Sequence, residues 1–120
     1  MEYPRDVVIV GGVRTAHGKF KGALFNTPAV DLGAMAISAT LEQTGLDSSM
    51  IDEVIMGNVL SAGIGQPPAR QSALKSGIPA AIPALTINKM CGSSMKAIML
   101  AANSIRAKES KIVMVGGMES

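Results

Sequence analysis

The one cysteine of this 120-residue sequence, Cys91, lies at a position where a thiol can do chemistry. A short apolar run over residues 83–87 precedes it, and an amphipathic run over residues 95–106 follows it. This pattern predicts that Cys91 sits where a strand turns into a helix. A helix start carries unpaired backbone N–H groups and the positive end of the helix dipole, and both favour a thiolate over a thiol. Because the thiolate is the nucleophilic form of cysteine, Cys91 is a candidate nucleophile.

The helix start alone does not complete such a site. A helix end contributes roughly 0.3–2 kcal/mol, so full activation of Cys91 needs a neighbouring base, usually a histidine. The same N–H groups can stabilise an oxyanion formed when a thiolate attacks a carbonyl. Gly92, Ser93 and Ser94 are small enough for a substrate to approach the backbone. The alternative is that a lone cysteine is a small buried hydrophobic residue, which is its commonest role.

Three other residues are candidates for acid–base chemistry. His17 is the only histidine and lies in a Gly- and Lys-rich stretch over residues 13–28. It would complete a dyad with Cys91, but its surroundings favour a loop histidine that faces solvent. Asp52 and Glu53 are adjacent carboxylates at the start of a predicted strand, where the usual role is that of solvated charge.

The same Gly- and Lys-rich stretch does not form a nucleotide-binding loop. A P-loop needs four residues between its first glycine and a Gly-Lys-Ser/Thr, whereas five separate Gly12 from Gly18. Phe20 follows Lys19 where a serine or threonine is required, and the dinucleotide pattern G-x-G-x-x-G is absent. The stretch is therefore predicted to be a loop without a phosphate site.

Composition narrows the class of protein. Hydrophobic residues make up 48% of the chain but aromatic residues only 2%, so the core must be aliphatic, with the nine methionines filling it. The net charge of +2 is small and no basic block accompanies it, which gives no support to nucleic-acid binding. A single cysteine excludes an intrachain disulfide and a cysteine-cluster metal site. No secretory signal is apparent at residues 1–6, and no apolar run has the length of a membrane span, so a cytoplasmic protein is expected.

Strands and helices are predicted to alternate along the chain. Strands are expected at 7–10, within 52–60, at 83–88 and at 111–115, and helices at 31–44, 69–76 and 92–108. We expect Thr27 or Asp31 to cap the first helix and Gly45 to end it. The order β-α-β-α-β-α-β predicts an α/β fold with a mainly parallel sheet covered on both faces. Ligands of such sheets bind beyond the carboxyl ends of the strands, which is where Cys91 lies.

Two of the predicted helices also show an apolar face in the sequence. The first helix has one formed by Leu32, Met35, Ala36, Ala39 and Thr40, with Leu41 beside them. The helix after Cys91 has one formed by Met95, Ile98, Met99, Ala102 and Ile105. An apolar stripe of this spacing is typical of a helix face that packs against a core.

The segment from Asn88 to Ile98, Asn-Lys-Met-Cys-Gly-Ser-Ser-Met-Lys-Ala-Ile, resembles the nucleophile segment of the thiolases, most closely of the biosynthetic type. Residues 10–15 with 18–20, 53–57, 65–71 and the final Val-Gly-Gly-Met-Glu-Ser of residues 115–120 resemble further segments of that family. Two departures are small: Ser94 stands where the family commonly has glycine, and Met95 where it commonly has leucine.

The resemblance implies a thiolase-like layered fold and an acyltransferase. The implied reaction is acetyl-CoA C-acetyltransfer, a Claisen condensation of two acetyl-CoA molecules or the reverse thiolysis, through an acyl-thioester on Cys91. The backbone N–H of Cys91 would contribute to an oxyanion hole. Coenzyme A thioesters would be substrates, with no tightly bound cofactor and no metal. The subunits of the family are typically dimers or tetramers, so a homo-oligomer is expected.

The resemblance covers only the first part of such a subunit. Residues 1–120 correspond to the N-terminal portion of a thiolase-like N-terminal domain, incomplete at its C-terminal end. The family's general-base histidine, second catalytic cysteine and Asn-His oxyanion pair come from the C-terminal half, and none can be placed here. The alternative interpretation is a catalytically inactive truncated fragment or an interaction module.

Overall fold

Three parallel strands form the sheet at the centre of the molecule, in the order β2-β1-β3. They are β1 (Glu53–Gly57), β2 (Ala84–Ile87) and β3 (Val113–Gly117). The computed structural model describes residues 6–120, so residues 1–5, on which the expectation about a secretory signal partly rests, lie outside the described residues. Every strand pair is parallel, as the alternation of strands and helices predicted.

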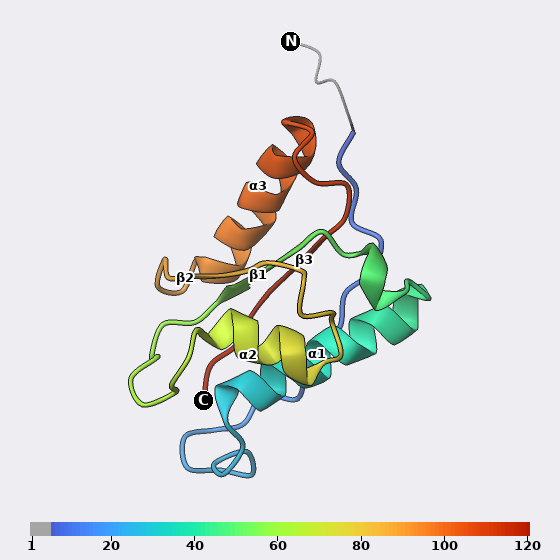
Figure 1. The fold of residues 1–120 in the computed structure, drawn as a ribbon. Coiled ribbons are helices and arrows are strands. Elements are labelled where there is room, and N and C mark those ends of the chain that lie inside the picture. The colour runs from blue at the N-terminus through green and yellow to red at the C-terminus, as the bar shows by residue number, and fades with distance from the viewer. Residues whose placement is uncertain (1–5) are drawn as a thin grey trace.

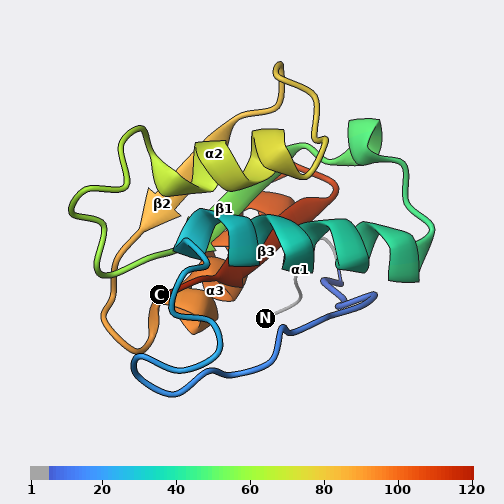
Figure 2. The same cartoon turned by 90° about the horizontal axis from the view of Figure 1, so that it is seen from below.

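Helices cover both faces of this sheet, which gives three layers (Figure 1). The helices α1 (Ala29–Thr44) and α2 (Pro68–Lys75) lie side by side on one face, and α3 (Ser93–Arg106) lies on the other (Figure 2). A short 3-10 helix, Ser48–Met50, was not predicted. The α/β prediction is thus confirmed, and the helices and β1 and β2 agree with their predicted positions to within about two residues.

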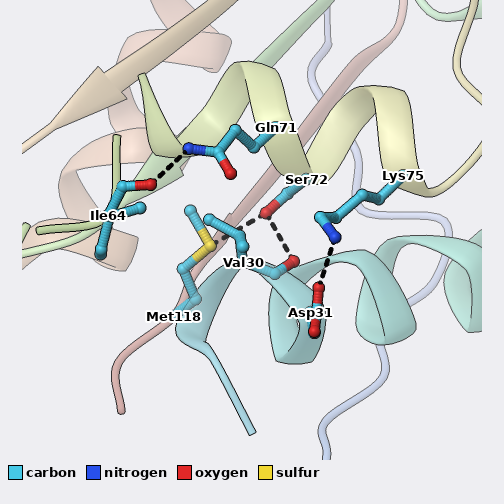
Figure 3. Close-up of polar contacts among 7 residues, drawn as sticks. All are labelled: Val30, Asp31, Ile64, Gln71, Ser72, Lys75 and Met118. Carbon is cyan, nitrogen blue, oxygen red and sulfur yellow. Dashed lines mark hydrogen bonds and ion pairs between the residues drawn. The ribbon is translucent and has the colours of Figure 1, made fainter. Parts of the chain in front are cut away.

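The start of α1 differs from the prediction, whereas its end agrees. Pro28 occupies the N-cap position without a side-chain cap, so the prediction that Thr27 or Asp31 caps the helix was wrong. Asp31 instead forms an ion pair of 2.9 Å with Lys75 on α2 (Figure 3). Gly45 ends α1 as expected: its φ is +69°, and its N–H donates to the carbonyl of Leu41 at 3.0 Å.

The apolar core lies between the sheet and the pair α1 and α2. Its centre is formed by Val54 and Met56 of β1, and aliphatic side chains surround them, as the composition predicted. The prediction for the methionines holds for Met56, Met114 and Met118, which are buried. It was wrong for five others, which are exposed: Met35, Met50, Met90, Met95 and Met99.

The predicted core face of α1 was wrong except for Leu41, which was expected beside it and is buried. The predicted core face of α3 was wrong because small residues of this helix face the sheet. The buried residues of α1 are Ala29, Val30, Gly33, Ala34, Ile37 and Leu41. On α3 only Ser93, Ala97 and Ala101 are buried, so its stripe of larger apolar residues points away from the sheet. A Cβ on Gly33 would lie 2.6 Å from Met118 Sδ and 2.8 Å from Ser72 Oγ, so glycine is what lets α1 approach this closely.

The predicted strand over residues 7–10 is absent. Val8, Ile9 and Val10 are exposed by 69% to 77% and belong to no ladder. A β-branched run becomes a strand only when it pairs with a neighbouring strand, and residues 7–10 pair with none of β1, β2 and β3. The segment after it contacts the end of α1, where Gly12 N–H donates to Gln43 Oε1 at 2.9 Å.

The last predicted strand forms, but its bounds differ. It was expected at residues 111–115 and lies at Val113–Gly117, so it includes both glycines that were expected to end it.

Asp52 joins the amino ends of β1 and β3. Its Oδ2 accepts hydrogen bonds from the backbone N–H groups of Lys111 at 2.7 Å and Ile112 at 3.0 Å, while its own N–H donates to the carbonyl of Ile112 at 2.9 Å. The hydrogen bonds from Ile112 and Lys111 hold the pKa of Asp52 below its ordinary value. This carboxylate therefore has a structural role at the end of the sheet away from Cys91.

We expect Asp52→Asn to lower the free energy of unfolding at neutral pH by about 1 kcal/mol, a value reduced for the exposure of the carboxylate. Because the folded-state pKa is depressed, this contribution is present above the unfolded-state pKa and is lost as the pH falls through the folded-state pKa. Urea unfolding of both proteins over a pH series measures it. The difference should shrink below about pH 3.9; a difference that stays constant down to the acid limit would contradict this role.

Candidate active site at the carboxyl ends of the strands

Cys91 lies between the end of β2 and the start of α3, where the sequence predicted it. Residues 88–93, called here the Cys91 turn, connect the two elements at the carboxyl ends of the parallel strands. The thiol is exposed, so Cys91 is not the small buried residue of the alternative interpretation. An exposed thiol at this edge of a parallel sheet is open to a substrate.

Short polar contacts hold the Cys91 turn in one conformation. Ser93 Oγ accepts from Lys89 N–H at 2.9 Å and donates to the carbonyl of Met90 at 2.7 Å. Asn88 Oδ1 accepts from Met90 N–H at 3.0 Å. The hydroxyl of Ser93 and the amide of Asn88 therefore bond the backbone on both sides of Met90. These two side chains carry no chemistry of their own in this arrangement; they set the shape of the turn.

The residue before Cys91 has a strained backbone. Met90 has a φ of +48°, in the left-handed region that costs a residue with a Cβ roughly 1–2 kcal/mol. Its side chain is 68% exposed, so packing does not explain this conformation. The hydrogen bonds of Asn88 and Ser93 maintain it. A sharp, strained turn from strand to helix is a common way to present a nucleophile above a parallel sheet.

Unpaired backbone donors lie at Cys91 and in the first turn of α3. The N–H groups of Gly92 and Ser93 donate to carbonyls within the turn. Within the described part of the chain, the N–H groups of Cys91, Ser94 and Met95 have no acceptor. Free N–H groups at a helix start favour negative charge nearby. The Cys91 turn therefore offers both a thiol and hydrogen-bond donors for an oxyanion.

Glycines at the ends of β1 and β3 allow α3 to begin directly above the sheet. A Cβ on Gly57 would lie 2.5 Å from Ser93 Cβ and 3.2 Å from the Ser93 carbonyl carbon. A Cβ on Gly117 would collide with Ser94 Oγ. Ser94, the departure from the commoner glycine, thus directs its hydroxyl toward the end of β3. The position of the Cys91 turn therefore requires glycine at the ends of both β1 and β3.

Asn58 and Glu119, which sequence analysis did not single out, also lie at this edge. Asn58 follows β1 directly and is only 2% exposed, and Glu119 lies two residues after the end of β3. The signal that could have found them is position: both are polar residues just beyond the carboxyl end of a strand of a parallel sheet.

The other candidates lie elsewhere or have no partner. His17 is exposed, and no hydrogen bond joins it to Cys91 within residues 6–120. Asp52 and Glu53 lie at the amino ends of the strands, away from the Cys91 turn. Among the described residues no group of three or more His, Cys, Asp or Glu side chains is arranged to hold a metal ion. In the same range, none of the helices combines the length and apolar character that crossing a membrane requires.

Polar contacts between α1, α2 and the segment after β3 support this edge from below (Figure 3). The buried Ser72 Oγ donates to the carbonyl of Val30 at 3.0 Å and contacts Met118 Sδ at 3.1 Å. On the same helix, Gln71 Nε2 donates to the carbonyl of Ile64 at 2.9 Å and so holds the loop between β1 and α2. Met118, which follows β3, is thereby packed against α1 and α2.

Comparison with known proteins places these features in a family context. Residues 7–120 match the family described as thiolase, N-terminal domain. Acetyl-CoA acetyltransferases of Cupriavidus necator and Pseudomonas aeruginosa are 57% and 53% identical over 96% and 97% of this chain, respectively. The solved structure of Acat5 thiolase from Ascaris suum in complex with coenzyme A matches 93% of the chain with a TM-score of 0.91 and 44% identity. The chain spans only 29% to 30% of the length of these relatives.

We expect Gly57→Ala to displace Ser93 and to lower the free energy of unfolding by about 1–3 kcal/mol, the usual effect of overpacking. Gly12→Ala is the matched control, because a Cβ there meets no atom within 4 Å, and it should change stability by less than about 0.5 kcal/mol. Urea unfolding of the three proteins measures both effects. Equal stability of the two variants would show that the close approach at Gly57 is not a constraint.

Proposed function

The chain belongs to the thiolase family, and from this membership we propose that it carries the acyl-accepting nucleophile, Cys91, of an acetyl-CoA acetyltransferase. The observation that carries the proposal is the exposed thiol of Cys91 at the carboxyl ends of the strands, beside unpaired N–H groups. Relatives named acetyl-CoA acetyltransferase, and a related thiolase solved with coenzyme A, support acyl-CoA as the substrate.

The proposed chemistry at Cys91 is acyl transfer in two steps. The Cys91 thiolate attacks the carbonyl carbon of an acyl-CoA thioester, and the carbonyl oxygen becomes an oxyanion beside the Cys91 N–H. When this intermediate collapses, the bond to the sulfur of coenzyme A breaks, its thiolate leaves, and the acyl group stays on Cys91 as a thioester. In condensation the carbanion of a second acyl-CoA attacks this thioester, and the Cys91 thiolate leaves. In thiolysis, the reverse reaction, the Cys91 thiolate attacks the 3-keto carbon of a 3-ketoacyl-CoA and the C–C bond breaks with release of the carbanion of an acyl-CoA. A free coenzyme A thiol then takes the acyl group from Cys91.

We propose that residues 1–120 form the N-terminal portion of the thiolase N-terminal domain and that the general base comes from another part of the enzyme. The chain covers less than a third of the length of its relatives, and within residues 6–120 no hydrogen bond joins His17 to Cys91. The complete enzyme is proposed to be a cytoplasmic homo-oligomer. A reducing compartment keeps a catalytic cysteine in its thiol form, which supports that location.

The outer face of α3 supports a second role, as a surface that binds further protein. Met95, Ile98 and Met99 are exposed by 70%, 43% and 52% and form a stripe on the side away from the sheet. Contiguous exposed apolar side chains of this kind usually mark a surface that another protein segment covers. We propose that the remaining part of a full-length subunit covers this stripe.

A chimera tests the enzymatic proposal. Residues 7–120 replace the matching segment of the Cupriavidus necator acetyl-CoA acetyltransferase, which is 57% identical over this region. We expect the chimera to form acetoacetyl-CoA from acetyl-CoA, and Cys91→Ala in it to lower kcat roughly a thousandfold or more. A Cys91→Ala chimera with the activity of its parent would overturn the proposal.

The isolated 120-residue chain is the control for this experiment. It should fold but show negligible turnover, because a lone thiol cannot both accept the acyl group and generate the carbanion. Formation of acetoacetyl-CoA by the purified chain, lost on Cys91→Ala, would show that the base lies within these residues.

The exposed stripe on α3 predicts that the isolated chain self-associates. The double variant Met95→Glu, Met99→Glu should shift the chain toward the monomer, because a charged side chain opposes burial of the stripe. Met50→Glu, an equally exposed methionine outside α3, is the matched control and should leave association unchanged. Sedimentation equilibrium measures the masses. If the native chain is monomeric at high concentration, the stripe does not drive association.

A further inference from the structure

Asn58 connects the carboxyl ends of all three strands. It follows β1, its backbone N–H donates to the carbonyl of Ile87 at the end of β2, and its Nδ2 donates to the carbonyl of Met118 after β3 at 3.1 Å. The Cys91 turn begins at the residue after Ile87. Asn58 is buried, so these bonds are shielded from water and hold the start of the turn to the end of the sheet.

Glu119 completes the connection from the side of β3. Its Oε1 accepts from Val59 N–H at 2.7 Å, and its Oε2 accepts from Leu60 N–H at 3.0 Å and from Asn58 Nδ2 at 3.5 Å. One carboxylate thus binds three donors of the segment that leaves β1. Hydrogen bonds to a charged acceptor are roughly twice as strong as neutral ones, so this contact orders residues 58–60.

The orientation of the Asn58 amide follows from these acceptors. Its nitrogen faces the carbonyl of Met118 and the carboxylate of Glu119, and a flipped amide would place oxygen against oxygen. Asn58 Oδ1 is therefore buried, and it has no donor within the described residues 6–120. A buried acceptor that lacks a donor destabilises the fold, so this orientation is retained against a local cost.

We propose that Asn58 and Glu119, together called the strand-end clamp, are positioning residues for Cys91. The clamp fixes the end of β2 relative to β1 and β3, and so aligns the Cys91 thiol with the unpaired N–H groups at the start of α3. This inference rests on the proposed role of Cys91 as a nucleophile. It assigns a role to two residues that neither accept the acyl group nor touch the thiol.

The opposite end of the sheet supplies a natural comparison. There Asp52 also uses one carboxylate to bind two backbone N–H groups and to join β1 to β3. Each carboxylate accepts hydrogen bonds from two backbone N–H groups at one end of the sheet, but only Glu119 lies at the end that carries Cys91. A role limited to stability predicts equal consequences for Cys91 from the loss of either carboxylate, whereas a positioning role predicts different ones.

The experiment measures the rate at which iodoacetamide alkylates Cys91 in the native 120-residue chain, with urea unfolding of each protein alongside. We expect Glu119→Gln and Asn58→Ala to lower the alkylation rate about threefold, the size of a helix-end effect on a thiolate. Asp52→Asn is the matched control and should lower stability without changing the rate. Because unfolding would itself bring the exposed Cys91 to the rate of an unstructured peptide, the rates are compared without denaturant, where the urea curves show each variant to be folded.

A second variant removes the same contact from its other side. Leu60→Pro eliminates the N–H that donates to Glu119 Oε2, at an exposed loop position that tolerates change. It should also slow alkylation, and combined with Glu119→Gln it should slow it by less than the product of the two effects. This variant keeps the test decisive if Glu119→Gln fails to fold.

Two results would overturn the proposal, and they are distinguishable. If native Cys91 reacts faster than a cysteine in an unstructured peptide and the clamp variants keep that rate, the clamp has no positioning role, while the proposed function stands. If native Cys91 reacts no faster than the peptide, the clamp has no positioning role in this chain, whereas the proposed function, whose base lies in another segment, is decided by the chimera. Slower alkylation in the clamp variants alone supports the proposal.

Discussion

The rest of the site depends on a steric constraint: α3 begins in contact with the bare α-carbons of two strand ends. Gly57 ends β1 against Ser93, and Gly117 ends β3 against Ser94. Because neither glycine has a side chain, the first turn of α3 lies directly on the edge of the sheet. The chain between β2 and α3 must then turn within a few residues, which puts Met90 in the left-handed region and leaves Cys91 exposed at the top of the turn. The exposure of Cys91 and the unpaired N–H groups next to it in the chain follow from this close approach.

Much of this arrangement could be predicted from local sequence. Alternating apolar runs and helical patterns identify β1, β2, β3 and the three helices, and the alternation predicts the parallel sheet. The placement of Cys91 follows from the same pattern, because it needs only the order of strand, turn and helix. Gly45 illustrates the strongest kind of signal, since a glycine just past a helical run supplies the left-handed residue that ends the helix.

The predictions that were wrong or missing concern tertiary contacts, which a local sequence pattern does not contain. Residues 7–10 have the composition of a strand, but they pair with none of the three strands of the sheet. The apolar stripe that includes Met95 and Met99 has the period of a core face, yet the small residues Ala97 and Ala101 face the sheet. Asn58 and Glu119 were missed because their importance lies in contacts between residues about 60 positions apart. Only the folded chain brings these groups together.

We therefore propose that these residues supply and position the nucleophile, and that other segments of a full-length enzyme supply the base. The most direct test of the central claim is to trap the acyl-enzyme. The chimera that carries residues 7–120 is mixed with acetyl-CoA, quenched in acid within the first turnover, and digested for mass spectrometry. We expect an acetyl group in thioester linkage to Cys91. An acetyl group on any other residue, or turnover without an acylated intermediate, would contradict it.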